Sequence, residues 1–355
     1  MYMFSHSLDK AKIGALRDLL GRSERIVILT HMSPDGDAIG SSTAFQRMMT
    51  ALGKEARVVI PDMLSAQLRR VPGAKEAVDA TRYPDFARQL IADADLLVCL
   101  DFNEPYRIGR LADSLVASEA RKVMIDHHLN PHKFPDVTIS DSSASSTCYL
   151  LLRVLCALSL ADEIDAKTAE SLLTGMMTDT GNFSYNARDP EIYEAVAWLM
   201  RRGADKDRIY REQFETHSLD SMLLNAYAIA EKMEVWPDLG AALIVLSRDE
   251  LNKFNYQKGD TESLVNRPLA IPGVVYSCFM REEDNFIKVS MRSVGDFPVN
   301  VLCSEHFGGG GHVNAAGGEF KGTLEQAAGL FRGLLEANKR KYIDKSKDKD
   351  TPEQK

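Results

Sequence analysis

Short apolar runs alternate with helical patterns through the first half of the chain, and this alternation is the clearest signal in the sequence. Runs without regular polar positions are typical of strands that are buried on both faces of a parallel sheet. The predicted strands are 25–30, 56–60, 96–100, 121–125 and 137–140. The predicted helices are 38–52, 145–158 and 166–177. This order predicts an α/β fold with an N-terminal parallel sheet and helices on both of its faces.

The second half of the chain has a different pattern, which predicts a smaller α+β domain. Helical patterns at 190–200 and 206–233 precede strands at 241–246, 274–280 and 286–291, the last two forming an antiparallel pair. A short helix at 298–306, a glycine-rich loop, a strand near 318–320 and a helix at 324–338 follow. These limits predict a first domain at 1–205, a helical connector at 206–234, a second domain at 235–338 and a charged, disordered tail at 339–355.

Composition and charge narrow the choice of partner. The chain is 45% hydrophobic and 26% charged, which is ordinary for a globular protein. Its net charge of −8 argues against a protein that coats long DNA by neutralising phosphates. A small phosphorylated substrate remains compatible, because bound divalent metal ions would reverse the local field. No apolar run approaches the roughly 20 residues of a membrane span, so no membrane partner is expected.

The cysteines and the N-terminus predict a cytoplasmic protein. The cysteines lie in apolar surroundings and form no CxxC pair, as expected for reduced core residues. They are Cys99, Cys148, Cys156, Cys278 and Cys303. The first residues lack a basic segment followed by an apolar one, so no signal peptide is predicted.

Acidic and histidine side chains stand at four comparable places, at strand ends or at the start of a loop. They are His31, Asp35 and Asp37, then Asp101, then Asp126, His127 and His128, and finally Asp179. The carboxyl ends of parallel strands meet at one crevice, where these groups would repel one another without cations. Carboxylate oxygens with a minority of imidazoles suit Mn²⁺ and, less tightly, Mg²⁺, and the lack of a thiolate ranks Zn²⁺ lower. Isolated helix caps are the alternative for any one segment, but they would not require all four to be ligand-rich.

These residues resemble a known family. His31-x-x-x-Asp35-x-Asp37, Asp101, Asp126-His127-His128 and Asp179-Thr180-Gly181 resemble the four motifs of the DHH phosphoesterases. The segment from Phe307 to Gly317 resembles the glycine-rich signature of the C-terminal domain associated with that family. The resemblance spans about residues 25 to 335 and implies an active site in the cleft between two domains. The two-domain length is most similar to oligoribonucleases that also dephosphorylate 3′-phosphoadenosine 5′-phosphate, the nanoRNase group.

The resemblance also implies roles for single residues in a site with two metal ions. One ion would be held by His31, Asp35 and Asp101. The other would be held by Asp37, Asp101, His127 and Asp179, so that Asp101 bridges both. His128 would contact the scissile phosphate, and Asp126 would orient a ligand imidazole. The motif positions are all intact, which favours a working hydrolase over a non-catalytic nucleotide sensor.

The second domain is expected to bind the substrate. His312 follows a run of glycines, including Gly310 and Gly311, where backbone N–H groups can approach a phosphate closely. Arg292 could bind a terminal phosphate through two hydrogen bonds. Asn314 is a weaker candidate for binding the substrate. The alternatives are a flexible hinge with an incidental histidine and an ordinary surface arginine.

Together these features predict a divalent-metal-dependent hydrolase of short oligoribonucleotides and 3′-phosphoadenosine 5′-phosphate, acting through a hydroxide between two metal ions. The alternative is a phosphodiesterase of cyclic dinucleotides or their linear products. An inorganic pyrophosphatase is less favoured, because by resemblance those enzymes lack the Gly-Gly-Gly-His signature. No oligomeric state is predicted.

Overall fold

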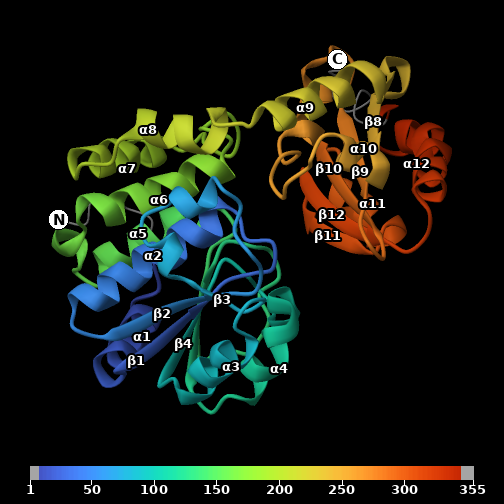
Figure 1. Ribbon diagram of the computed structural model, residues 1–355. Helices are drawn as coiled ribbons and strands as arrows, with labels where there is room; N and C mark the ends of the chain where they lie inside the picture. Colours follow the sequence, from blue (N-terminus) through green and yellow to red (C-terminus); the bar gives the residue numbers. More distant parts are fainter. Residues whose placement is uncertain (1–7, 345–355) are drawn as a thin grey trace, which may run out of the picture. The chain divides into compact units, whose positions relative to one another are not determined.

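The computed structural model describes residues 8–344, and the chain forms two compact units (Figure 1). The first unit ends at Thr216 and the second begins at His217. Of the tail predicted at 339–355, residues 339–343 form a turn of π-helix. Residues 345–355 lie outside the described part of the chain. Between residues 8 and 344, no helix has the length and apolar character needed to cross a membrane.

The first unit is built on a six-stranded sheet in which all neighbouring strands are parallel. The strand order is β3-β2-β1-β4-β5-β6. The strands are β1 (Arg25–Leu29), β2 (Glu55–Ile60), β3 (Val78–Asp79), β4 (Leu96–Leu100), β5 (Arg121–Asp126) and β6 (Val137–Ser140). The predicted parallel sheet is thus confirmed. Strand β3 was not predicted, because two half-buried edge residues leave no apolar run in the sequence.

Helices cover both faces of this sheet, as predicted (Figure 1). One face shares its core with α1 (Lys10–Arg22), α2 (Gly36–Ala51), α5 (Thr147–Ala157), α6 (Ala166–Asp179), α7 (Pro190–Arg201) and α8 (Lys206–Tyr210). The other face packs against α3 (Pro84–Asp93) and α4 (Ala112–Ala117). Strand β1 shows the division, because Ile26 and Ile28 join the first core while Val27 and Leu29 join the second. Short 3₁₀ segments complete the unit: η1 (Leu68–Arg70), η2 (Ala74–Glu76), η3 (Pro105–Leu111) and η4 (Ala161–Glu163).

The strand order creates a switch point between β1 and β4. After β1 the chain moves outward to β2 and β3, and it then returns to the other side of β1 as β4. At such a point the connections leave in opposite directions, so a crevice opens beyond the carboxyl ends of the two strands. His31 follows β1 and Asp101 follows β4. The topology therefore places both residues at the same crevice.

Helices α2 and α6 pack closely because both carry glycine where they meet. A Cβ on Gly40 would lie 2.4 Å from the backbone oxygen of Ser171. A Cβ on Gly175 would lie 2.3 Å from Cys148 Sγ and 2.7 Å from Asp37 Oδ1. This close approach brings α6, which ends in Asp179, against the first turn of α2, which carries Asp37.

The second unit is a six-stranded mixed sheet with the order β11-β12-β10-β9-β8-β7. Its strands are β7 (Met233–Trp236), β8 (Ala241–Leu246), β9 (Tyr276–Glu282), β10 (Ile287–Ser293), β11 (Gly309–His312) and β12 (Ala315–Phe320). Strands β8 and β9 are parallel, and the other neighbouring pairs are antiparallel, including the predicted pair β9–β10. One core includes α11 (Val299–His306) and α12 (Leu324–Asn338), and the other includes α9 (Leu219–Glu231), α10 (Arg248–Lys253) and η7 (Leu264–Ala270). A 3₁₀ turn, η6 (Pro237–Leu239), joins β7 to β8.

Parts of this region differ from the predicted elements, and β7, α10 and η7 were not predicted. The helical pattern at 206–233 is broken, since α8 ends at Tyr210, a π-helical turn spans 211–215 and Ser218 caps α9. The glycine-rich segment, predicted as a loop, forms β11 instead and pairs with β12. A Cβ on Gly309 would lie 1.9 Å from the backbone oxygen of Gly317, so this strand pair requires glycine. Glycine-rich strands lack the apolar pattern on which strand prediction depends.

We expect Gly40→Ala to destabilise the protein, because the new methyl group meets backbone that cannot move without separating α2 from α6. Overpacking of this kind costs about 1–3 kcal/mol. The matched control is Gly14→Ala in α1, where a Cβ has no neighbour within 4 Å. There the gain in helix propensity should stabilise the protein by up to about 1 kcal/mol. Urea denaturation measures both effects, and equal stabilisation by the two variants would contradict the proposed close contact.

Candidate metal centre

The eight residues predicted for the metal site of the first domain form one contact network at the carboxyl edge of the sheet. They are His31, Asp35, Asp37, Asp101, Asp126, His127, His128 and Asp179. Seven of them lie near the ends of β1, β4 and β5 or at the start of α2. Asp179 is different, because it is the last residue of helix α6.

The first group of ligand atoms is His31, Asp35 and Asp101. The Nε2 of His31 lies 3.9 Å from Asp35 Oδ2 and 3.4 Å from Asp101 Oδ2. Its Nδ1 lies 2.7 Å from the backbone oxygen of Met32, and a carbonyl can only accept, so Nδ1 carries a hydrogen. In the neutral imidazole, Nε2 therefore presents a lone pair toward two carboxylates. Asp35 also caps α2 through its other oxygen, so the capping alternative and the ligand position coexist.

The second group is Asp37, His127 and Asp179, with Asp101 beside it. The Nε2 of His127 lies 3.9 Å from Asp37, 3.7 Å from Asp101 and 3.3 Å from Asp179. Its Nδ1 donates to the backbone oxygen of Ala144 at 3.2 Å, which again leaves Nε2 facing carboxylate oxygens. The two groups therefore share the same chemistry and adjoin at Asp101.

Asp101 is buried and held in an unusual backbone conformation. It is 1% exposed, and its φ of +66° is rare for a residue with a side chain. Such conformations cost about 1–3 kcal/mol and persist where the surroundings determine them, commonly at functional sites. One oxygen faces His31, while the other accepts a hydrogen bond from Thr147 Oγ1 at 2.8 Å. The carboxylate is thus fixed between the two ligand groups.

Asp37 is fixed by the start of helix α5. Its two oxygens accept from the backbone N–H groups of Thr147 and Cys148, at 2.6 Å and 2.8 Å. Backbone N–H groups at a helix N-terminus favour an anion, so α5 supports this buried carboxylate. Thr147 thereby contacts both Asp37 and Asp101. Sequence reasoning missed Thr147, since a threonine at a helix start is ordinarily a capping residue.

Asp126 pairs with His128 rather than with His127. The Nδ1 of His128 donates to Asp126 Oδ1 at 2.7 Å, and Asp126 has no exposed surface. Its Oδ2 lacks a hydrogen-bond partner among the described residues. The carboxylate therefore sets the hydrogen position and orientation of the His128 ring.

The pKa values show how strongly this cluster needs positive charge. Burial, followed by the charges of Asp101 and Asp179, raises the pKa of Asp37 well above its usual range. Burial also raises the pKa of Asp179 to about 7, despite the opposing effect of His127. Burial alone would lower the pKa of His127, but the carboxylates facing its ring outweigh burial and raise that pKa to about 10. Without metal ions, protons must supply the missing charge, so the donor set fits divalent cations.

The predicted substrate-binding residues lie in the second unit. Arg292 and His312 both pair with Ala315 of β12, so their side chains lie on one face of the sheet. Gly310 is open, because a Cβ there would have no neighbour within 4 Å, while Gly311 has a φ of +141°. Asn314 donates to Ser293 Oγ at 2.9 Å and to the Gly295 oxygen at 2.8 Å. These two bonds use both hydrogens of its amide to hold a turn, which disfavours a substrate role.

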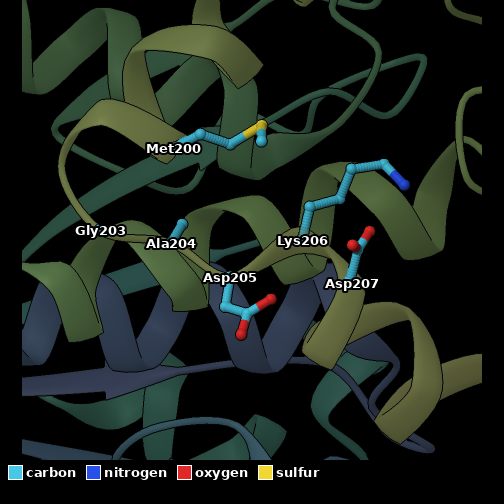
Figure 2. A pocket seen from close by; sticks show the side chains of 6 residues that line it. All are labelled: Met200, Gly203, Ala204, Asp205, Lys206 and Asp207. Atoms are coloured by element: carbon cyan, nitrogen blue, oxygen red, sulfur yellow. The ribbon is translucent and has the colours of Figure 1, made fainter.

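A surface hollow between α7 and α8 is separate from this cluster (Figure 2). It is lined by Met200, Gly203, Ala204, Asp205, Lys206 and Asp207. Asp205 caps α8 by accepting from the Arg208 N–H at 3.0 Å. None of the predicted site residues lines it, so we assign the hollow to the junction of two helices.

We expect Asp179→Asn to change how the stability of the metal-free protein depends on pH. A carboxyl group whose pKa is raised on folding stabilises the folded state at low pH. That contribution is complete below the unfolded-state pKa of about 4 and is lost as pH rises through the folded-state pKa. In EDTA, the melting temperature of Asp179→Asn minus that of the wild type should therefore increase from about pH 5 to about pH 8. Circular dichroism at several pH values measures this difference.

Adding Mn²⁺ should make the melting temperature of the wild type higher than that of Asp179→Asn. A ligand at a hundredfold excess over its Kd stabilises the folded state by about 2.7 kcal/mol, and the asparagine variant should gain less. If the difference in melting temperature between Asp179→Asn and the wild type did not change with pH or with Mn²⁺, both the raised pKa of Asp179 and its assignment as a metal ligand would be contradicted.

Comparison with known proteins agrees with this geometry. The N-terminal domain of the DHH family matches residues 25–176, and the DHHA1 domain matches residues 240–338. A bifunctional oligoribonuclease and PAP phosphatase, NrnA of Thermus thermophilus, is 33% identical over 318 residues, which are 88% of each chain. The cyclic-di-AMP phosphodiesterase PdeA of Listeria monocytogenes is 27% identical over 91% of this chain, which spans only 49% of that longer protein.

A solved structure extends the match to three dimensions. An exopolyphosphatase-related protein from Bacteroides fragilis is 44% identical and superposes with a TM-score of 0.91, covering 95% of this chain and 98% of that one. The four motifs, the two matching domains and this relative agree along nearly the whole chain. The chain therefore belongs to the DHH family and carries a DHH domain followed by a DHHA1 domain.

Proposed function

We propose that this protein is a metal-dependent phosphoesterase that hydrolyses short oligoribonucleotides and 3′-phosphoadenosine 5′-phosphate to mononucleotides. The observation that carries the proposal is the pair of ligand groups that adjoin at the buried Asp101. The choice of substrate is supported by the NrnA relative, which matches 88% of both chains. The cytoplasm is the proposed compartment, since the five cysteines are unpaired thiols, as expected in reducing surroundings.

Two divalent ions are proposed to occupy the centre. His31, Asp35 and Asp101 would hold one ion, and Asp37, Asp101, His127 and Asp179 would hold the other. Mn²⁺ suits a donor set that mixes carboxylates with imidazoles, and Mg²⁺ is the alternative. When bound, such a pair of ions supplies a nucleophilic hydroxide near neutral pH and neutralises charge on attacking and leaving oxygens.

The protein itself contributes orientation and proton control. Thr147 and the N-terminus of α5 fix the carboxylates of Asp37 and Asp101, so little reorganisation is needed when substrate binds. Asp126 holds the hydrogen of His128 on Nδ1, which directs the other ring nitrogen to contacts with a phosphate oxygen. In its protonated form the ring would donate from Nε2 to that oxygen and stabilise the negative charge that develops on the phosphate.

The second unit is proposed to select the end of the substrate. Arg292 and His312 share one face of the sheet, and the open backbone at Gly310 leaves room beside them. A guanidinium group can bind a terminal phosphate through two parallel hydrogen bonds. Such contacts favour short chains with a terminal phosphate over the interior of long ones.

Product release from a matched panel tests the proposed function. With Mn²⁺ present, the wild type should release mononucleotides from 5′-phosphorylated RNA of two to five nucleotides and AMP from 3′-phosphoadenosine 5′-phosphate. Turnover of a cyclic dinucleotide and of pyrophosphate should be much slower. A preference for the cyclic dinucleotide would instead favour the activity named for the PdeA relative. No turnover of any phosphoester would contradict the proposed enzyme.

Arg292→Ala tests whether Arg292 binds the terminal phosphate of the substrate. It should lose activity mainly on substrates with a terminal phosphate, by about tenfold or more, since a charged hydrogen bond contributes about 1.5–3 kcal/mol. Equal losses on RNA with and without a 5′-phosphate would remove this role.

We expect His128→Ala to keep its metal ions and to lose about 100-fold or more of kcat, as for removal of one preorganised donor. The ring contacts the cluster through Asp126 and Asp101 but lies outside both proposed ligand sets. Calorimetric titration with Mn²⁺ and steady-state kinetics on 3′-phosphoadenosine 5′-phosphate separate the two effects. Loss of Mn²⁺ binding together with activity would show that His128 is itself a ligand.

A further inference from the structure

One arginine beside the metal centre lacks a partner for its charge. Arg107 lies in η3, six residues after Asp101. Its Nε is buried without a hydrogen bond, and between residues 8 and 344 no acidic side chain pairs with its guanidinium. Leaving such a donor unsatisfied costs about 1–3 kcal/mol, and more for a charged group. A cost of this size calls for a compensating role.

The backbone, rather than the charge, holds Arg107 in place. The N–H of Met32, directly after His31, donates to the backbone oxygen of Arg107 at 2.7 Å. Gly109 interrupts the segment with φ +55° and ψ −123°, and a Cβ there would lie 2.4 Å from Met32 Sδ. The segment is thus closely packed against the loop of the first ligand group. Its position does not depend on the guanidinium.

The surroundings of Arg107 are charged, yet they do not neutralise it. Its backbone oxygen accepts from the N–H of Met32, so Arg107 lies beside His31 of the first ligand group. The carboxylates there, Asp35 and Asp101, face the ring of His31 instead. An arginine beside carboxylates ordinarily forms a short bidentate ion pair with one of them. Here the carboxylates face the proposed metal site, so the guanidinium of Arg107 can bind an anion that comes from outside the chain.

We propose that Arg107 is a further catalytic residue, whose guanidinium donates hydrogen bonds to the phosphate group of the substrate. This inference rests on the proposed phosphoesterase function. A planar guanidinium matches two phosphate oxygens in both shape and charge. Because the backbone that carries it is held in place before substrate arrives, the guanidinium can stabilise the charge that builds up on phosphate oxygens in the transition state. Arg107 acts in the first unit, whereas Arg292 belongs to the second.

The test compares Arg107→Ala, Arg107→Lys and the control Arg110→Ala. Arg110 lies on the same segment and is exposed, so its loss should leave kcat and KM unchanged. Arg107→Ala should lower kcat about 100-fold or more on 3′-phosphoadenosine 5′-phosphate and on bis(p-nitrophenyl) phosphate, a substrate without a nucleoside. Arg107→Lys should retain part of this activity, because it keeps the charge without the planar fork.

Two further readouts separate a catalytic role from a structural one. Mn²⁺ affinity, measured by calorimetry, and the melting temperature should not fall in Arg107→Ala, since the guanidinium pairs with nothing in the described chain. Millimolar guanidinium chloride should restore part of the activity of Arg107→Ala but none of that of His128→Ala.

Loss of Mn²⁺ binding, unchanged kcat or failure of guanidinium rescue would each overturn the role of Arg107. If the alanine variant does not fold, Arg107→Gln replaces it in the same assays. A separate result would contradict the proposed function. If the wild type hydrolyses bis(p-nitrophenyl) phosphate but no nucleotide, the proposed substrates are wrong, while the role of Arg107 can still be tested on bis(p-nitrophenyl) phosphate.

Discussion

The rest of the first unit depends on one constraint, which is the burial of several carboxylate groups close to one another. Asp37 and Asp101 are almost fully buried, and two imidazoles present their Nε2 atoms to them. Such a cluster is costly unless cations compensate it. The protein reduces the cost with helix α5, whose first residues donate to both carboxylates. The remaining charge is left for divalent ions, so the feature that destabilises the metal-free protein is also the one that binds metal.

The fold supports this arrangement from two directions. The switch point between β1 and β4 brings His31 and Asp101 to one crevice, as the strand order requires. Asp37 and Asp179 come from helices instead, and the glycines at the α2–α6 contact let those helices approach. The contact between α2 and α6 therefore both stabilises the first unit and positions two of the proposed ligands.

The sequence predicted the sheet well, and it named as candidate ligands the residues that the structure brings together, because both leave strong local signals. Strands β4 and β6 have the predicted limits, since uninterrupted apolar runs mark buried parallel strands. The glycine strand β11 and the edge strand β3 were missed, as neither has an apolar pattern. Thr147 and Arg107 were missed for a different reason. Their importance lies in contacts, or missing contacts, that form only when the chain folds.

Anomalous scattering from crystals grown with Mn²⁺ tests the central claim most directly. Two peaks about 3.5–4 Å apart are expected, as in other two-metal sites, with Asp101 between them. One peak should lie beside His31 and Asp35, and the other beside His127 and Asp179. A single peak, or peaks away from Asp101, would contradict a shared two-ion centre.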